Sequence, residues 1–182
     1  MAQRVEIRLA GTGGQGLILA GVILADAAVR DGKYVVQSQS YGPEARGGAS
    51  RAEVIVSDEE IFYPKVLSAD ILLCMSQMAC DYYGTLLKKR GLIILDDTQV
   101  DRAPTTYAVR APITQIAQEA TGRAITANIV ALGLLVGLTG VVSRESLEAA
   151  VRARAPKGTE ELNLRALQAG FEEAARIIEE RK

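Results

Sequence analysis

Apolar positions along the chain form short strand-like runs that alternate with longer helical patterns. A first strand begins at residue 4 and leads directly into a glycine turn, and five more strands are expected at residues 33–39, 52–56, 70–75, 92–95 and 106–110. Helical spacing predicts helices over residues 14–30, 77–89 and 112–121, and then over 127–138, 143–154 and 159–180. Strands that alternate with helices, followed by helices alone, predict an α/β fold: a Rossmann-like three-layer sandwich with a mostly parallel sheet and a C-terminal helical layer.

Length and composition fit one domain that spans residues 1–182. The 21 basic and 22 acidic residues leave a net charge of −1, so we expect neither a nucleic-acid partner nor attraction to a membrane surface. The first residues lead straight into a strand pattern with no room for a signal peptide, and we expect a cytoplasmic protein. The longest apolar stretch, residues 124–142, is interrupted by polar residues and glycines and indicates a buried helix rather than a membrane span.

Glycines in a G-x-G-x-x-G spacing follow the first strand and open the first helix. In this arrangement Gly11 is expected to take a positive φ, Gly13 to let a ligand approach the backbone, and Gly16 to let the helix pack closely on the strand. The amides of Gly13, Gly14, Gln15 and Gly16 would then offer hydrogen bonds to a phosphate at the positive end of the helix dipole.

Two other interpretations of this turn remain open. Dinucleotide-binding folds place an acidic residue at the end of the second strand, and here that strand ends in Gln37-Ser38-Gln39-Ser40-Tyr41. The missing acid and the absence of histidine argue against an NAD-dependent enzyme without excluding a stand-alone nucleotide-binding protein. The glycines could also serve only to make a tight turn.

A second loop, residues 38–50, is expected at the C-terminal end of a parallel strand, the edge at which such sheets bind ligands. Its candidate binding residues are Tyr41, Gly42, Pro43, Glu44, Arg46, Gly47 and Gly48. Arg46 offers a planar, permanently charged fork for a phosphate or carboxylate, and Glu44 could hold it in place. The alternative is a solvated loop with a local ion pair.

Three further residues have side chains that could carry chemistry: Cys74, Cys80 and Asn128. Cys74 and Cys80 have neither metal-ligand nor redox spacing and are expected to be core thiols, so no metal site is predicted. Asn128 opens an apolar helix, where capping of that helix is favoured over contact with a ligand. No residue is assigned a catalytic role.

The two glycine-containing motifs together resemble the gamma subunit of 2-oxoacid:ferredoxin oxidoreductases. The resemblance continues through Arg51-Ala-Glu-Val54, Tyr63-Pro-Lys-Val66, Asn128-Ile-Val-Ala-Leu-Gly133 and the pattern from Pro156 to Gly170, which together cover nearly the whole chain. Pyruvate-type subunits look more like Phe-Gly-Pro-Glu-Arg-Arg-Gly in the second loop, and indolepyruvate-type subunits more like His-Gly-Met-Ser-Gln-Arg-Gly-Gly. The loop in this chain is most similar to the 2-oxoglutarate type, with a pyruvate, branched-chain or indolepyruvate type as the alternative.

The resemblance implies a complex that converts a 2-oxoacid, coenzyme A and oxidised ferredoxin into acyl-CoA, carbon dioxide and reduced ferredoxin. Thiamine diphosphate with Mg²⁺ and the iron-sulfur clusters would lie on partner subunits, since two unspaced cysteines cannot bind a cluster. The implied partners are alpha and beta subunits, in many members a ferredoxin-like delta subunit, and ferredoxin as the electron acceptor. The isolated chain is then expected to be inactive and to be able to self-associate.

For this chain the resemblance suggests that both loops face a shared active site and hold the phosphate-bearing end of coenzyme A. The cofactor-binding residues expected on this basis are Gly11, Gly13, Gly14, Gln15, Gly16, Tyr41, Gly42, Pro43, Glu44, Arg46, Gly47 and Gly48. Another alternative is a purely structural subunit, in which both loops form subunit interfaces without touching a ligand.

Overall fold

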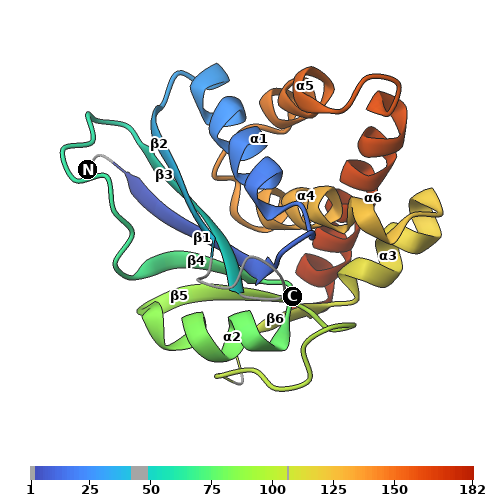
Figure 1. Cartoon of the computed structure of the whole chain (residues 1–182), viewed down its shortest axis with the longest axis horizontal. Coiled ribbons are helices and arrows are strands. Elements are labelled where there is room, and N and C mark those ends of the chain that lie inside the picture. The colour runs from blue at the N-terminus through green and yellow to red at the C-terminus, as the bar shows by residue number, and fades with distance from the viewer. Residues whose placement is uncertain (1–2, 42–48, 106) are drawn as a thin grey trace.

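Six strands form a mixed sheet in the order β2-β3-β1-β4-β5-β6, in which every strand except β3 runs in the same direction (Figure 1). The computed structural model describes residues 3–41, 49–105 and 107–182. The strands are β1 (Arg4–Thr12), β2 (Tyr34–Tyr41), β3 (Ala49–Ser57), β4 (Ala69–Cys74), β5 (Leu87–Asp96) and β6 (Val109–Ala111). The expected mostly parallel sheet is therefore confirmed.

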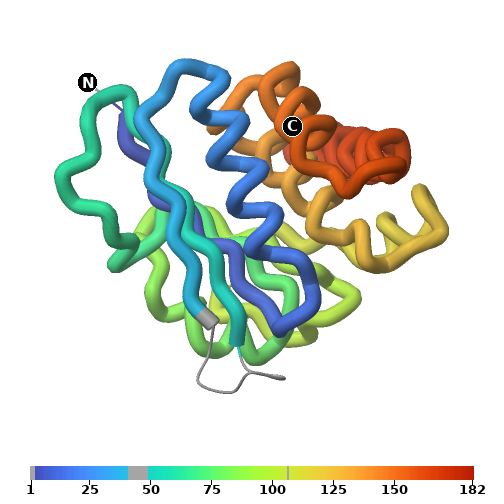
Figure 2. Tube along the Cα trace, turned by 45° about the horizontal axis from the view of Figure 1, so that its top comes forward, coloured from blue at the N-terminus to red at the C-terminus, as the bar shows by residue number. Residues whose placement is uncertain are grey.

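Helices cover both faces of the sheet, but unequally. The helices are α1 (Leu17–Arg30), α2 (Gln77–Tyr83), α3 (Ile113–Thr121), α4 (Ala127–Thr139), α5 (Arg144–Arg154) and α6 (Glu160–Glu180), with short 3-10 turns η1 (Gly84–Leu86) and η2 (Ala124–Thr126). One face carries α1 and the C-terminal helices, and the other carries α2 (Figure 1). In Figure 2, α1 runs between the β2–β3 hairpin and the C-terminal helices. The three-layer arrangement with a C-terminal helical layer is thus confirmed.

The second strand runs in the same direction as the first, as expected, but it makes no parallel pair. β2 pairs only with β3, in antiparallel register, and β3 separates it from β1. Both strands are longer than expected, because β2 continues to Tyr41 and β3 begins at Ala49, so residues 38–41 and 49–50 of the predicted loop are strand. Strand pairing satisfies the backbone groups of these polar residues, which a sequence pattern alone assigns to a loop.

Three other boundaries differ from the prediction. The helix expected over residues 77–89 ends at Tyr83, and residues 87–90 begin β5 instead, because Leu87 pairs with Ala69 of β4 and packs against the apolar residues beneath α2. Tertiary pairing here overrides the helical propensity of Leu and Lys. The first helix begins at Leu17 rather than at residue 14, and β6 begins at Val109, whereas Thr106, the start expected for that strand, lies outside the described residues.

The apolar stretch expected to be a buried helix is α4, which is apolar all round and buried from Ala127 to Val136. It packs against α6 so closely that a Cβ on Gly133 would lie 2.3 Å from the carbonyl oxygen of Leu167. Among the residues that the structure describes, no helix has the length and apolar character needed to cross a membrane.

Asp31 joins the end of α1 to the start of α5. Its carboxylate accepts hydrogen bonds from the Ser143 amide, the Ser143 hydroxyl and the Ser146 hydroxyl, each at 2.6 Å. Partial burial opposes ionisation of Asp31, but the hydrogen bonds from the two serines outweigh it and hold the pKa of the carboxyl below its ordinary value of 3.8. The network stabilises the folded state only while the carboxyl is ionised.

Replacing Asp31 by Asn is therefore expected to lower the free energy of unfolding by about 1–2 kcal/mol at pH 7. Because the pKa is lower in the folded chain than in the unfolded chain, this contribution is complete at neutral pH and is lost as the pH falls through the folded-state pKa. The difference between wild type and Asp31→Asn should thus close below about pH 4. Urea unfolding from pH 7 to pH 3 measures it, with the exposed Asp101→Asn as control; a constant difference over that range would contradict the account.

Candidate functional site

The glycine turn joins β1 to α1 at the C-terminal edge of the sheet. Positive φ values occur at Gly14 (91°) and Gly16 (73°), the left-handed region that glycine adopts without strain. Gly11 belongs to β1 and does not have a positive φ, so that part of the prediction is wrong. The residues with positive φ lie three and five positions after Gly11, and the G-x-G-x-x-G spacing alone does not show which glycine takes this conformation.

Gly11 is needed for a different reason, because no space exists for a side chain there. A Cβ would lie 2.1 Å from Gln15 Oε1 and 2.7 Å from Leu17 Cδ1. By contrast, a Cβ on Gly13 would meet nothing within 4 Å among the described residues, so packing there does not require a glycine.

The side chain of Gln15 holds the turn in place. Gln15 Oε1 accepts a hydrogen bond from the Thr12 amide at 2.8 Å, and Gln15 Nε2 donates to the Met75 carbonyl oxygen at 2.7 Å. Since Met75 follows β4, the side chain ties the ends of β1 and β4 together. The backbone amide of Gln15 points back to the Thr12 carbonyl at 3.4 Å, so the phosphate-binding role expected for this amide competes with a contact inside the turn.

Asn128 of α4 forms a second side-chain contact with the glycine turn. It is the second residue of α4 rather than its cap, and its Nδ2 donates to the carbonyl oxygen of Gly16 at 3.0 Å while its Oδ1 accepts from the Ile129 amide. Asn128 is therefore not the N-cap of α4, although it satisfies one amide of the first turn as the capping interpretation expected. Two residues that are far apart in the sequence meet here, and the helical pattern around Asn128 gave no signal of the contact.

The register of the strands brings the two sequence motifs to one edge. Tyr41 at the end of β2 pairs with Ser50 at the start of β3, and Ser50 pairs with Gly11 of β1. The backbone at both ends of the second loop therefore lies beside Gly11, where β1 leads into the glycine turn. Gly42, Pro43, Glu44, Arg46, Gly47 and Gly48, together with the side chain of Tyr41, lie outside the described residues.

A hollow of about 270 Å³ opens beside the turn at this edge. It is lined by Gly14, Gln15, Met75, Gln99, Thr114, Ala124, Ile125 and Ala127. The neighbouring strands β1 and β4 lead to helices on opposite faces of the sheet, and ligands of open α/β sheets bind at such a switch point. Sequence reasoning missed Gln99, Thr114 and Ile125, because these residues reach the hollow from loops and helix ends without a motif.

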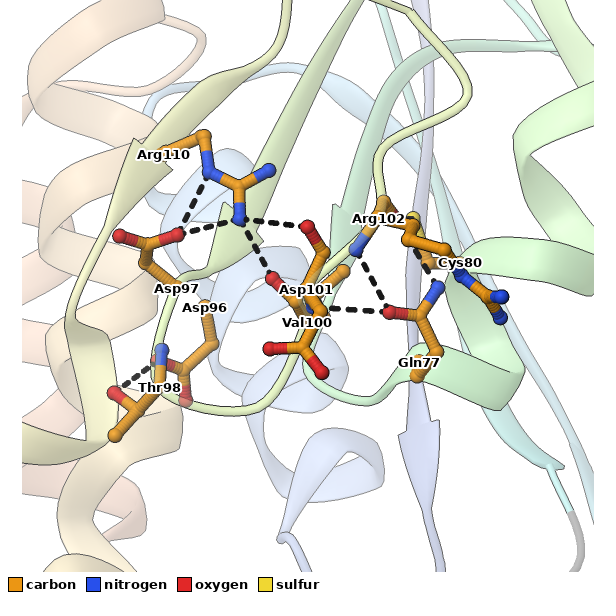
Figure 3. A network of polar contacts seen from close by, with 9 residues as sticks. All are labelled: Gln77, Cys80, Asp96, Asp97, Thr98, Val100, Asp101, Arg102 and Arg110. Atoms are coloured by element: carbon orange, nitrogen blue, oxygen red, sulfur yellow. Dashed lines mark hydrogen bonds and ion pairs between the residues drawn. The ribbon is translucent and has the colours of Figure 1, made fainter.

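A polar network fixes the loop that carries Gln99 (Figure 3). Gln77 Oε1 accepts from the Asp101 amide at 2.9 Å and the Arg102 amide at 3.0 Å. Arg110 Nε donates to Asp97 Oδ1 at 2.7 Å, and its Nη2 donates to the Val100 carbonyl oxygen at 2.8 Å. These hydrogen bonds hold the loop from which Gln99 lines the hollow.

A larger hollow of about 630 Å³ lies at the opposite edge of the sheet, away from the glycine turn. Its charged residues already have partners: Lys33 with Asp58, and Asp31 with Ser143. This hollow therefore lacks the unpaired groups that would point to a ligand.

The glycine turn supplies the chemistry of an anion site. Among the described residues, the amides of Gly13, Gly14 and Gly16 have no protein acceptor, and α1 has no side-chain cap at its N-terminus. Unpaired amides and the helix dipole favour a negatively charged group. The two cysteines are buried, and the pKa of the Cys74 thiol is raised by its hydrogen bond to Cys80 and by burial, as expected for core thiols.

The fold is that of an α/β protein whose glycine turn lies at the switch point of a mostly parallel sheet. Residues 6–173 match the family model of the pyruvate ferredoxin/flavodoxin oxidoreductases, and the chain belongs to this family. The 2-oxoglutarate synthase subunit KorC of Methanocaldococcus jannaschii is 52% identical over 181 residues, which cover 96% of each chain. The ketoisovalerate oxidoreductase subunit VorA of Methanothermobacter thermautotrophicus is 35% identical, and the match covers 96% of this chain but 37% of VorA.

Two solved structures support the same family. The gamma subunit of a keto/oxoacid ferredoxin oxidoreductase from Geobacter sulfurreducens PCA superposes with a TM-score of 0.86 at 49% identity, covering 96% of this chain and 98% of that one. The 2-oxoglutarate:ferredoxin oxidoreductase from Magnetococcus marinus with 2-oxoglutarate, coenzyme A and succinyl-CoA bound gives a TM-score of 0.85 at 25% identity. The match covers 96% of this chain and 31% of the Magnetococcus chain.

Proposed function

We propose that this chain is the gamma subunit of a 2-oxoglutarate:ferredoxin oxidoreductase complex and that its 182 residues act as one domain. The complex would convert 2-oxoglutarate, coenzyme A and oxidised ferredoxin into succinyl-CoA, carbon dioxide and reduced ferredoxin. The observation that carries this proposal is the 52% identity to KorC over nearly the full length of both chains. Tyr41 in the second loop, where pyruvate-type subunits have Phe and indolepyruvate-type subunits have His, also supports 2-oxoglutarate as the substrate.

The role proposed for this chain is to hold the phosphate-bearing end of coenzyme A. The unpaired amides of Gly13, Gly14 and Gly16 fit an anionic phosphate, and the strand register carries the chain on both sides of Arg46 to the same edge. The structure with coenzyme A bound from Magnetococcus marinus contains a region of the same fold. Coenzyme A supplies the thiol that accepts the acyl group, and this chain's residues bind and orient it.

Thiamine diphosphate, Mg²⁺ and the iron-sulfur clusters are assigned to the alpha, beta and ferredoxin-like delta subunits. Within this chain the cysteines are two, both buried in the core, and a cluster needs several thiolates together. The subunit would act in the cytoplasm with ferredoxin as the electron acceptor of the complex.

Replacing Arg46 by Ala tests the contact with coenzyme A. We expect the KM for coenzyme A of the assembled complex to rise about tenfold or more, because a hydrogen bond to a charged group contributes about 1.5–3 kcal/mol. The control is Arg152→Ala, an exposed arginine of α5 paired with Glu161, which should leave the KM unchanged. An Arg46→Ala complex that assembles with an unchanged KM would exclude the contact. Impaired assembly with an unchanged KM would favour a purely structural subunit.

A further inference from the structure

Two arginines on the face of the sheet that α2 covers share a single carboxylate. Arg8 Nε of β1 donates to Glu53 Oε1 at 2.8 Å, and Arg51 Nε lies 3.6 Å from the same oxygen. Arg51 stands two residues before Glu53 on β3, so both side chains are on the same face of the strand. Both guanidinium groups also lie over the ring of Tyr83 from α2, Arg8 at 5.2 Å and Arg51 at 5.7 Å from the ring centroid. The four side chains therefore form one cluster, with two positive charges and one negative charge.

The carboxylate of this cluster is already engaged by Arg8. Arg8 is 2% exposed and Glu53 8% exposed, and the contact between them is the closer of the two that Glu53 makes. Arg8 Nη2 donates further to the Val66 carbonyl oxygen at 2.7 Å, whereas Arg8 Nη1 is buried and has no hydrogen-bond partner among the described residues. Donors thus already exceed acceptors around Arg8. Glu53 balances the charge of this buried arginine, which leaves the charge of Arg51 uncompensated.

Arg51 is the member of the cluster that reaches solvent. Its side chain is 34% exposed, and its contact with the buried ring of Tyr83 restricts the movement of the guanidinium. At 3.6 Å its Nε is too far from Glu53 for a normal hydrogen bond, and no hydrogen bond within the described part of the chain engages its Nη1 or Nη2. A guanidinium with two available Nη donors is suited to a phosphate or a carboxylate.

The strand register places Arg51 next to the glycine turn. Arg51 pairs with Ala10 of β1, and the preceding residue, Ser50, pairs with Gly11, from which the chain runs into the turn. This edge of the sheet therefore offers two kinds of donor to an anion: the unpaired backbone amides of the turn and the guanidinium beside them. A ligand with two anionic groups can use both at once.

We propose that Arg51 binds a phosphate group of coenzyme A, an inference that rests on the proposed function. Coenzyme A carries a diphosphate and a separate phosphate on its ribose, so one ligand supplies an anionic group to the glycine turn and another to Arg51. Arg8, Glu53 and Tyr83 are positioning residues, because they contact the guanidinium but are themselves buried. The pattern Arg51-Ala-Glu-Val54 then has a physical reason, since alternate residues of a strand share a face.

Arg51→Gln tests the contact in the purified complex of this chain with its alpha and beta partners. We expect the KM for coenzyme A to rise about tenfold, because a hydrogen bond to a charged group is lost, with an unchanged KM for 2-oxoglutarate and an unchanged melting temperature of the isolated chain. Arg51→Lys keeps the charge without the planar fork and should give a smaller rise.

The matched control is Arg4→Gln, which should leave the KM for coenzyme A unchanged. Arg4 lies on the same face of β1 as Arg8, and 33% of its side chain is exposed, nearly as much as for Arg51. It stands at the opposite end of β1, however, and donates to Glu6 and to the Tyr63 carbonyl oxygen.

Dephospho-coenzyme A, which lacks the ribose phosphate, identifies the group that Arg51 binds. If Arg51 binds the ribose phosphate, wild type and Arg51→Gln have the same KM for dephospho-coenzyme A; if it binds the diphosphate, the variant keeps the higher KM. Either result, together with the raised KM for coenzyme A, supports the contact.

Four results would count against the proposal. An unchanged KM for coenzyme A in an assembled Arg51→Gln complex, an equal rise in Arg4→Gln, or a rise in the KM for 2-oxoglutarate instead would overturn it. Impaired assembly with an unchanged KM would also overturn it and would assign Arg51 to a subunit interface. A wild-type complex without activity that depends on 2-oxoglutarate and coenzyme A would instead reject the proposed function, and the contact with it.

Discussion

Gly170→Ala is expected to lower the free energy of unfolding by about 3 kcal/mol, near the upper end of the usual cost of overpacking. A Cβ at Gly170 would lie 2.1 Å from the carbonyl oxygen of Val130 and 2.8 Å from the amide nitrogen of Leu134. Both are backbone atoms of α4, so no side-chain rotation relieves the overlap and the two helices must separate. The loss should occur although alanine favours a helix over glycine by about 1 kcal/mol.

The effect should reach the candidate site as well as the core. α4 carries Asn128, whose side chain holds the Gly16 carbonyl, so a displaced α4 loosens the glycine turn. Urea unfolding of the isolated chain measures the change in stability, and Gly13→Ala is the matched control because a Cβ there meets nothing within 4 Å. Equal stability of Gly170→Ala and wild type would show that α4 and α6 are not packed as described.

Glu53→Ala is expected to destabilise the chain by about 3–5 kcal/mol, because it leaves a buried arginine without its counter-charge. Arg8 is 2% exposed and Glu53 8% exposed, and they are direct neighbours on β1 and β3 with Arg8 Nε 2.8 Å from Glu53 Oε1. The Arg8 guanidinium also lies over the ring of Tyr83 at 5.2 Å, but a ring face does not replace a carboxylate.

A double variant separates the contribution of the intact ion pair to stability from the destabilisation caused by leaving one partner unpaired. Arg8→Met combined with Glu53→Leu removes both charges and keeps apolar volume, and replacements of this kind are often neutral or stabilising. We expect the double variant to recover most of the stability that Glu53→Ala loses. A double variant as unstable as Glu53→Ala would mean that the unpaired charge of Arg8 does not cause the loss of stability, contrary to the account.

Much of the architecture could be predicted from the sequence because it depends on local patterns. The period of the apolar residues located β4, α4 and the C-terminal helices, and Asp31-Gly32 marked the end of α1, where Gly32 has a φ of 75°. The partner of each strand could not be predicted, because pairing joins residues far apart in the chain. The antiparallel pairing of β2 with β3 alone was missed for this reason, and the helix expected to continue to residue 89 was wrong for the same reason.

In the candidate site too, local features could be predicted from the sequence and contacts between distant residues could not. The glycine motif located the turn, since its spacing is local, but which glycines have a positive φ depends on packing against Leu17, Met75 and Asn128. The role of Asn128 could not be deduced, because its partner Gly16 lies on another helix end. Gln99 and Thr114 line the hollow because the loop after β5 and the start of α3 meet there, and no residue pattern predicts that arrangement.

The most direct test of the proposed function is to co-express this chain, tagged, with its candidate alpha and beta partners and to assay the purified complex. The assay follows reduction of ferredoxin or a viologen dye that depends on both 2-oxoglutarate and coenzyme A. We predict that the activity co-purifies with the tagged chain and is lost when this chain is omitted. A chain that purifies alone, while alpha and beta turn over 2-oxoglutarate without it, would contradict the account and favour a stand-alone nucleotide-binding protein.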